Sequence, residues 1–273
     1  MSLQARLSDR LAAHGLQANK GLGQHFLLDL NVTRKIARLS EAQEGDEVIE
    51  VGPGPGGLTQ ALLETGARVT AVERDGRFLP ILAELGEAFP GRLKVIHDDA
   101  LKVDEAALTG PDGARIVSNL PYNVGTPLLV KWLTGPFHPR SMTLMFQKEV
   151  AGRIVAGPGS PDYGRLSVLV SAVAARRLVL EAPARAFTPP PKVDSAVVHL
   201  TPREDPVRGR RLGALQAVTA AAFGQRRKML RAGLKSLGGE ALCLSAGVDP
   251  SARPETLDLA GFLRLADALL TKA

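Results

Sequence analysis

The stretch Glu47-Val-Ile-Glu-Val-Gly-Pro-Gly-Pro-Gly-Gly-Leu-Thr59 is the strongest indication of the fold. Its first five residues form a short run that favours a β-strand, a loop of glycine and proline follows, and residues 58–64 have the composition of a helix. A strand that enters a helix through a glycine-rich turn is typical of a parallel sheet with helices on both faces. The sequence therefore predicts an α/β protein that binds its ligand at the carboxyl ends of the strands.

The segments on either side of this stretch continue the alternation of strand and helix. Strands are expected at 68–73, 93–97, 115–118 and 142–146, and helices at 2–15, 29–40, 58–64 and 78–89. After Thr201 the pattern predicts only helices, at 212–223, 227–237, 240–246 and 259–269. The stretch 201–209 contains Pro202 and Pro206 and is typical of a linker. We therefore expect two domains, 1–203 with the sheet and 204–273 with helices alone.

Composition indicates an ordinary globular chain. Of its 273 residues, 45% are hydrophobic and 23% charged, and no apolar run is long enough to span a bilayer. The first residues lack an apolar core followed by a small-residue cleavage site, so we expect no signal peptide and a cytoplasmic location. The single cysteine, Cys243, excludes an internal disulfide and is interpreted as a small buried residue.

Positive charge is concentrated late in the chain. The net charge is +6, and residues 203–235 contain nine basic and two acidic residues, so the remainder is nearly balanced. Clustered charge favours binding to RNA phosphates over the alternative, a solvated helix face. We expect Arg226, Arg227 and Lys228 to be at the centre of this contact.

The glycine loop itself argues against a dinucleotide. A pyrophosphate is held by backbone N–H groups, and Pro53 and Pro55 have none. S-adenosyl-L-methionine is a sulfonium cation without phosphate, so it needs the close approach that Gly52 and Gly54 permit but not the anion nest. The loop therefore favours S-adenosyl-L-methionine over a nicotinamide dinucleotide.

Two acidic positions at later strand ends extend this prediction. Glu73 lies 21 positions beyond Gly52, where a carboxylate can accept the two ribose hydroxyls of an adenosine; the alternative is a surface carboxylate paired with a neighbouring arginine. Asp99, followed by Ala100, can accept a hydrogen bond from the adenine amine, or can simply cap a helix.

The segment Ser118-Asn-Leu-Pro-Tyr-Asn123 carries the chemistry. An exocyclic adenine amine is a poor nucleophile, and two acceptors aimed at its hydrogens would favour a more tetrahedral nitrogen. The side chain of Asn119 and the backbone carbonyl of Leu120 can serve, since Pro121 holds the chain extended. Tyr122 offers a face for an unpaired or flipped base. The alternative is an ordinary strand-ending turn. The histidines lack the spacing of metal ligands, so no metal is expected.

Ordered motifs along nearly the whole chain resemble the small-subunit ribosomal RNA adenine dimethyltransferases. They are Gly23-Gln-His-Phe-Leu27, residues 50–59, Glu73, Asp99-Ala100, Asn119-Leu-Pro-Tyr-Asn-Val124, Gln147-Lys-Glu-Val-Ala-Gly-Arg-Ile154, Tyr163-Gly-Arg-Leu-Ser167, Phe187-Thr-Pro-Pro-Pro-Lys-Val-Asp-Ser-Ala-Val197 and Ala222-Phe-Gly-Gln-Arg-Arg-Lys228.

The resemblance implies a class I (Rossmann-like) methyltransferase with a seven-stranded, mostly parallel sheet and a small helical domain. It implies dimethylation of two adjacent adenines in a hairpin loop near the 3′ end of 16S rRNA, late in the assembly of the small (30S) subunit. We expect a monomer, because the sequence shows no stripe that suggests self-association. The implied cofactor contacts are His25, Leu27, Gly52, Gly54, Glu73, Asp99, Ala100 and Asn119. Phe187 is implied to pack on the target base opposite Tyr122, and Lys148 and Arg153 join the expected RNA contacts.

One position departs from the family, which usually has asparagine where this chain has His25. A neutral imidazole donates and accepts much as an amide does. A protonated imidazole would place a cation beside the sulfonium, so cofactor affinity is expected to fall as the imidazole becomes protonated.

Four other functions remain open at this stage. They are a large-subunit adenine methylase that confers macrolide resistance, a DNA adenine methylase, a ribosome-assembly factor whose methylation is incidental, and a dinucleotide oxidoreductase. Leu120 and the long 187–197 segment favour the small-subunit enzyme over the first. The absence of a separate base-reading domain disfavours the second, and Pro53 and Pro55 disfavour the last.

Overall fold

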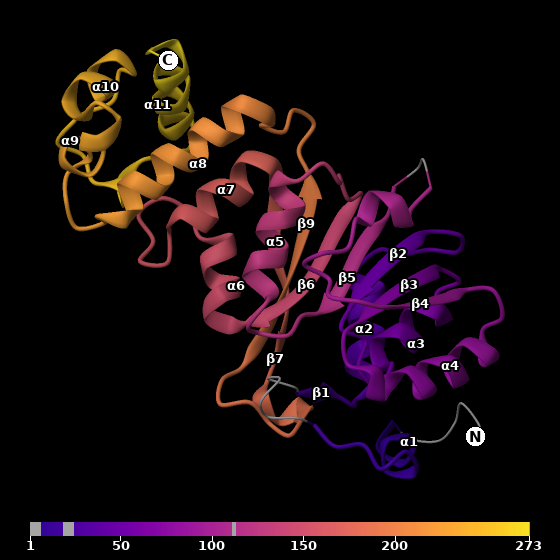
Figure 1. Cartoon of the computed structure of the whole chain (residues 1–273). Coiled ribbons are helices and arrows are strands. Elements are labelled where there is room, and N and C mark those ends of the chain that lie inside the picture. Colours follow the sequence, from indigo (N-terminus) through magenta and orange to yellow (C-terminus); the bar gives the residue numbers. More distant parts are fainter. Residues whose placement is uncertain (1–6, 19–24, 111–112, 273) are drawn as a thin grey trace. The chain divides into compact units, whose positions relative to one another are not determined.

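The structure, a computed structural model, describes residues 7–18, 25–110 and 113–272. Its centre is a seven-stranded sheet in the order β4-β3-β2-β5-β6-β9-β7 (Figure 1). These strands are β2 (Glu47–Val51), β3 (Arg68–Glu73), β4 (Leu93–His97), β5 (Arg115–Asn119), β6 (Ser141–Gln147), β7 (Ala174–Ala182) and β9 (Ser195–Pro202). Strands β2 to β6 pair in parallel and β9 runs antiparallel to β6, so the sheet is mostly parallel. The expected fold class is confirmed.

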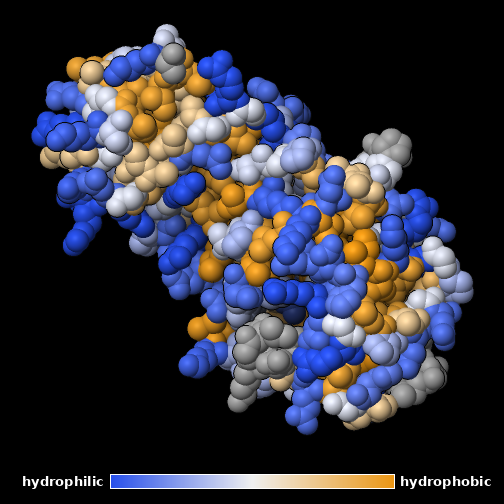
Figure 2. All heavy atoms as spheres, in the orientation of Figure 1, coloured by the Kyte–Doolittle hydropathy of each residue, from blue (hydrophilic) through white to orange (hydrophobic). Residues whose placement is uncertain are grey.

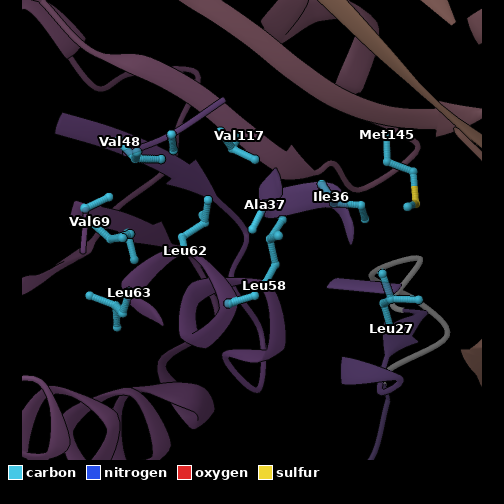
Figure 3. Close-up of a cluster of buried hydrophobic side chains, with 14 of the residues drawn as sticks. Leu27, Ile36, Ala37, Val48, Leu58, Leu62, Leu63, Val69, Val117 and Met145 are labelled. Carbon is cyan, nitrogen blue, oxygen red and sulfur yellow. The ribbon is translucent and has the colours of Figure 1, made fainter. Parts of the chain in front are cut away.

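Helices cover the two faces of the sheet because its strands carry apolar side chains on both sides. Helices α2 (Leu30–Leu39), α3 (Gly57–Glu64) and α4 (Leu79–Ala88) lie on one side, and α5 (Gly125–Thr134) lies on the other (Figure 1). In Figure 3, Leu58 and Leu62 of α3 pack with Val48, Val69 and Val117 of three strands in one buried cluster.

A second sheet of two short strands joins distant parts of the chain. Strand β1 (Phe26–Leu27) pairs antiparallel with β8 (Phe187–Thr188), so Leu27 lies opposite Phe187. Helix α1 (Leu7–Ala13) precedes β1, and Leu11 packs in a cluster with Phe26 and Phe78. This pairing brings two predicted site residues, Leu27 and Phe187, next to each other.

The remaining helices are α6 (Lys148–Val155), α7 (Arg165–Val173), α8 (Gly209–Gly224), α9 (Leu230–Gly233), α10 (Gly239–Ser245) and α11 (Leu259–Lys272). The predicted helix 227–237 was wrong in its first residues: Arg226 and Arg227 form a turn, and α9 begins only at Leu230. The described part of the predicted helix 2–15 is α1; residues 1–6 lie outside the described residues.

The chain divides into two compact units. The first comprises residues 1–151 and 177–201, and the second comprises residues 152–176 and 202–273. The predicted domains, 1–203 and 204–273, agree with this division near Thr201 and differ for residues 152–176. Those residues join the second unit because Tyr163 Oη donates to the Leu257 carbonyl (3.0 Å) and the Gly159 N–H donates to the Glu255 carbonyl (2.8 Å).

In the part of the chain that the structure describes, no helix is long and apolar enough to cross a membrane. The face shown in Figure 2 mixes hydrophilic and hydrophobic residues.

Candidate active site

The glycine loop between β2 and α3 uses its own N–H groups and leaves none for a phosphate. Gly52 (φ +67°) and Gly54 (φ +53°) both adopt the left-handed conformation that favours glycine. The N–H of Gly52 donates to the Val72 carbonyl, that of Gly54 to a carboxylate oxygen of Glu73, and that of Gly56 to the Pro53 carbonyl. Since Pro53 and Pro55 carry no N–H, the loop is built for close approach and not for holding an anion.

Two cavities meet at this loop, and Gly52, Glu73 and Pro121 line both. All the predicted catalytic residues line the first cavity: Asn119, Leu120, Pro121, Tyr122 and Phe187. The predicted cofactor contacts His25, Leu27, Gly52, Gly54 and Glu73 line it too. The second cavity, of about 350 Å³, is lined by Glu73, Asp99 and Ala100. The structure thus brings every predicted catalytic and cofactor residue to one of two cavities that share lining residues at the carboxyl ends of the strands.

Glu73 is held in place by its own surroundings at the end of β3. It is buried, Oε1 accepts the Asp75 N–H at 2.7 Å, and Oε2 accepts the Gly54 N–H at 3.0 Å. Burial raises the pKa of Glu73, while the backbone donors of Asp75 and Gly54 oppose the rise. A carboxylate oxygen has more than one acceptor position, so both oxygens retain lone pairs for a pair of hydroxyls.

Glu50 opens the 50–59 motif, but the sequence analysis assigned it no role. It lies on β2 next to the glycine loop, is buried, and lines the first cavity. Its Oε2 has no hydrogen-bond partner among the described residues. Burial raises the pKa of Glu50 to about 8, the Thr59 hydroxyl opposes this rise, and nearby Glu73 adds to it. Glu50 is therefore largely protonated at neutral pH and can both donate and accept.

The segment after β5 is anchored on both sides. Ser118 Oγ donates to the Val51 carbonyl (2.5 Å), which ties the end of β5 to the glycine loop. Tyr122 Oη and Ser195 Oγ share a hydrogen bond of 2.7 Å, and Phe187 is buried in the wall of the same cavity. Burial raises the pKa of Tyr122, so its hydroxyl stays neutral and its ring forms a fixed face.

His25 lies against Tyr122, with ring centroids 5.8 Å apart. Its Nδ1 lies 2.8 Å from the Pro189 carbonyl oxygen. A carbonyl only accepts, so Nδ1 is the ring nitrogen that carries the proton. The two residues are 164 positions apart in the chain.

The residues at the site fit a cationic adenosine derivative. No lysine or arginine occurs among the described lining residues of the first cavity, and Glu50 offers it an unpaired carboxyl oxygen. Asp99 forms a loose ion pair with Arg74 (3.7 Å), and its Oδ1 accepts the Leu101 N–H, which leaves acceptor capacity toward the second cavity. In the described residues, no group of His, Cys, Asp and Glu is placed to hold a metal ion.

The predicted RNA-binding residues are distributed over both units. Arg227 and Lys228 are exposed in the turn between α8 and α9, whereas Arg226 donates to the Pro161 carbonyl (2.6 Å) within the second unit. Lys148, in the first unit, pairs with Glu181 at 2.8 Å, and Arg153 is exposed on α6. The structure leaves their role in RNA binding a prediction.

Besides Glu50, sequence reasoning missed Thr33 and Phe26, which line the first cavity, and Val124 and Leu128, which line the second. Phe26 had a signal, because it lies between His25 and Leu27 in the quoted motif. Thr33 and Leu128 had none, because each occupies an ordinary position on a helix.

Comparison with known proteins places this site in a family. The family model for ribosomal RNA adenine dimethylase matches residues 15–270. The ribosomal RNA small subunit methyltransferase A of Phenylobacterium zucineum (strain HLK1) is 64% identical, over 100% of this chain and 96% of its own length. The protein of the same name from Caulobacter vibrioides is 65% identical, over 93% of this chain and 98% of its own.

Solved structures agree with this assignment. A dimethyladenosine transferase from Plasmodium falciparum superposes with a TM-score of 0.73 at 26% identity, covering 88% of this chain and 96% of that one. The 23S rRNA methyltransferase ErmE gives a TM-score of 0.69 at 27% identity, covering 89% and 99%. With its glycine loop, strand-end acids and Asn119–Tyr122 segment in one site, the chain belongs to the ribosomal RNA adenine dimethylase family.

Proposed function

We propose that the protein transfers methyl groups from S-adenosyl-L-methionine to the N6 amines of two adjacent adenines in a hairpin loop near the 3′ end of 16S rRNA. The observation that carries the proposal is the position of the Asn119–Tyr122 segment. It lines the same cavity as the loop residue Gly52 and the strand-end acid Glu73. The identity of 64–65% to two small-subunit methyltransferases supports the small-subunit substrate over the 23S rRNA that ErmE's name specifies.

The proposed cofactor, when bound, supplies a methyl group on a positively charged sulfur. Glu73 holds the ribose hydroxyls, and Asp99 and Ala100 border the cavity for the adenine ring. The first cavity, where the remainder of the cofactor would be held, is lined by His25, Leu27, Gly52, Gly54 and Asn119. The protonated carboxyl of Glu50 can accept from, or donate to, a polar group of the ligand there.

The reacting amine is activated by two hydrogen-bond acceptors that its two hydrogens point toward. The side-chain carbonyl of Asn119 and the backbone carbonyl of Leu120 accept them, which favours a tetrahedral nitrogen with an available lone pair. Pro121 holds this stretch extended, and Ser118 anchors it to β2. The flat faces of Tyr122 and Phe187 hold the base in plane, and stacking of this kind contributes about 1–3 kcal/mol per base.

The target adenine has to be unpaired or flipped, because a base inside a duplex cannot reach a recessed cavity. No protein base is needed: methylation makes the nitrogen cationic, and its proton then leaves readily to water. Tyr122 takes no part in proton transfer, since its hydroxyl is bonded to Ser195 and burial raises its pKa.

The proposed partner is the RNA of the assembling 30S subunit, bound by a monomer in the cytoplasm. Arg226, Arg227, Lys228, Lys148 and Arg153 are the basic residues proposed to contact its phosphates.

The test is a methyl-transfer assay with labelled S-adenosyl-L-methionine and unmethylated 30S subunits, followed by nucleoside analysis. We expect N6,N6-dimethyladenosine with the wild-type chain and a loss of at least about a hundredfold with Asn119→Ala, since one preorganised hydrogen-bond partner contributes about that much. Cofactor binding by the variant is measured in parallel to show that the fold is intact. Label on 23S rRNA alone would contradict the small-subunit assignment. An Asn119→Ala chain that supports subunit assembly would favour the assembly-factor function.

A further inference from the structure

Lys131, a residue outside the sequence motifs, bridges two walls of the second cavity. It lies on α5, whose Leu128 lines that cavity from one side. Residues 98–101, between β4 and the short helical turn Glu105–Leu108, line it from the other side. Position 131 follows Leu128 by three residues, so both side chains extend from nearly the same face of α5.

The ammonium group of Lys131 is fully engaged. Its Nζ donates to the carbonyl of Ala100 at 2.8 Å, to the carbonyl of Val103 at 2.5 Å, and to Oε1 of Glu105 at 2.8 Å. An ammonium has three donors, and all three are used. Two of the three acceptors are backbone carbonyls: Ala100 lines the cavity, and Val103 follows the lining residues by two positions.

The buried carboxylate of Glu105 neutralises the charge of Lys131. The side chain of Glu105 is 4% exposed, and Oε1 also accepts from the buried indole of Trp132 at 2.7 Å. The Lys131 side chain is 27% exposed, so the ion pair is only partly buried. An ion pair in which every donor has an acceptor favours one geometry more than it stabilises the fold as a whole. The pair therefore sets the distance between α5 and the 99–105 segment.

The segment that Lys131 holds also carries Asp99, whose carboxylate lines the cavity. Asp99 Oδ1 accepts the Leu101 N–H at 3.0 Å, and the Asp99 carbonyl accepts the Lys102 N–H at 2.8 Å. The orientation of Asp99 is thus set by the turn 99–102, and Lys131 holds the middle of that turn through Ala100.

We infer that Lys131 is a positioning residue for the adenosine half of the cofactor. Its ammonium holds the carbonyls of Ala100 and Val103 against α5, and so preorganises Asp99 and Ala100 for the adenine ring. The inference rests on the proposed use of S-adenosyl-L-methionine. The same helix α5 follows the Asn119–Asn123 segment closely, so one element carries the target-base loop at its start and the adenosine wall about one turn later.

The experiment compares three variants of the full chain by calorimetric titration with S-adenosylhomocysteine. The double change Lys131→Met with Glu105→Gln removes the hydrogen bonds of Lys131 and leaves no buried charge, since the glutamine side-chain carbonyl can still accept from Trp132. Glu105→Gln alone is the matched control, because Lys131 keeps both backbone carbonyls. Lys131→Arg keeps the charge beside Glu105, but a planar guanidinium cannot reproduce the tripod of donors.

We expect the double variant to bind S-adenosylhomocysteine about tenfold more weakly, the change produced by about 1.4 kcal/mol of lost preorganisation. Glu105→Gln should stay within about twofold of wild type, and Lys131→Arg should fall between them. In the methyl-transfer assay the KM for S-adenosyl-L-methionine should rise while kcat at saturation changes little, because the Asn119 segment is untouched.

Two results would overturn the inference and are distinguishable. Equal affinities for wild type, the double variant and Lys131→Arg, with unchanged thermal unfolding, would mean that Lys131 does not shape the cavity. A loss of kcat with unchanged affinity for S-adenosylhomocysteine would mean that Lys131 affects the target base and not the cofactor. A wild-type chain that binds no S-adenosylhomocysteine would overturn the proposed function itself.

Discussion

At the scale of single residues, three carboxyl groups of the site have different chemistry because their surroundings differ. Glu50 is buried with an unpaired oxygen, Glu73 is buried but held by two backbone N–H groups, and Asp99 is partly exposed beside Arg74. Burial raises the pKa of Glu50 and of Glu73, and at Glu73 the backbone N–H groups of Asp75 and Gly54 oppose the rise. The pKa of Glu50 reaches about 8, so Glu50 is the acid of the site that is largely neutral.

Glu50 makes the stability of the protein depend on pH. Its pKa is about 8 in the folded chain, against an ordinary value of 4.5, so the folded state binds its proton more tightly than the unfolded state. The stability it contributes is fully present below pH 4.5 and is lost as the pH rises toward 8 and beyond. Glu50→Gln, which cannot ionise, should flatten this decline, with a difference on the order of a few kcal/mol between about pH 5 and about pH 8.5.

Urea unfolding of wild type and Glu50→Gln at those two pH values, without cofactor, measures this difference. Parallel pH dependences for the two proteins would show that Glu50 ionises normally in the folded chain.

At the scale of elements, the basic residues in the turn between α8 and α9 differ in their contacts. Arg226 is engaged with the Pro161 carbonyl, and Arg227 and Lys228 extend into solvent. The predicted helix over 227–237 would have included Arg227 and Lys228, whereas both lie in the turn before α9, which begins at Leu230. Tertiary hydrogen bonds place the start of α9 at Leu230. The N–H of Leu230 donates to the Ala252 carbonyl, and the N–H of Arg231 donates to the Pro250 carbonyl.

Replacing Arg227 and Lys228 together with alanine should weaken RNA binding and reduce its salt dependence. Each lost phosphate contact lowers the slope of log K against log salt by about 0.7–0.9, so the pair should lower it by about 1.5. The exposed Lys35 on α2, changed to alanine, is the matched control. S-adenosylhomocysteine affinity should be unchanged in both. An unaltered slope for the double variant would make these residues a solvated surface.

At the scale of the whole molecule, residues 152–176 belong with the helical unit. Helix α7 buries Val168 and Leu169, and the N–H groups of Arg203 and Val207 donate to backbone carbonyls at the end of that helix. A chain that ends at residue 203 therefore keeps one part of the second unit without the other.

Such a 1–203 fragment should expose apolar surface and self-associate. A chain that joins 1–151 to 177–201 through a short Gly-Ser linker removes the second unit completely and should remain more monomeric. Size-exclusion chromatography and binding of a hydrophobic dye compare the two. Equal behaviour would mean that 152–176 folds independently of 202–273.

Elements with local signals could be predicted from the amino-acid sequence alone. The valine-rich runs at 47–51 and 68–73, the glycine loop after the first, and the segment at 119–122 all lie where expected, because strand propensity and turn chemistry act over a few residues. The limits of the sheet-bearing domain were predicted less well, since residues 152–176 carry no local sign of the unit they join.

Properties that depend on residues distant in the chain emerged only with the folded molecule. The protonation of Glu50, the Gly54–Glu73 hydrogen bond, the Nδ1 proton of His25 and the contacts of Lys131 with two backbone carbonyls each require partners that the fold brings together. Burial and hydrogen-bond pairing set the energy of a polar group, and neither is a property of local sequence.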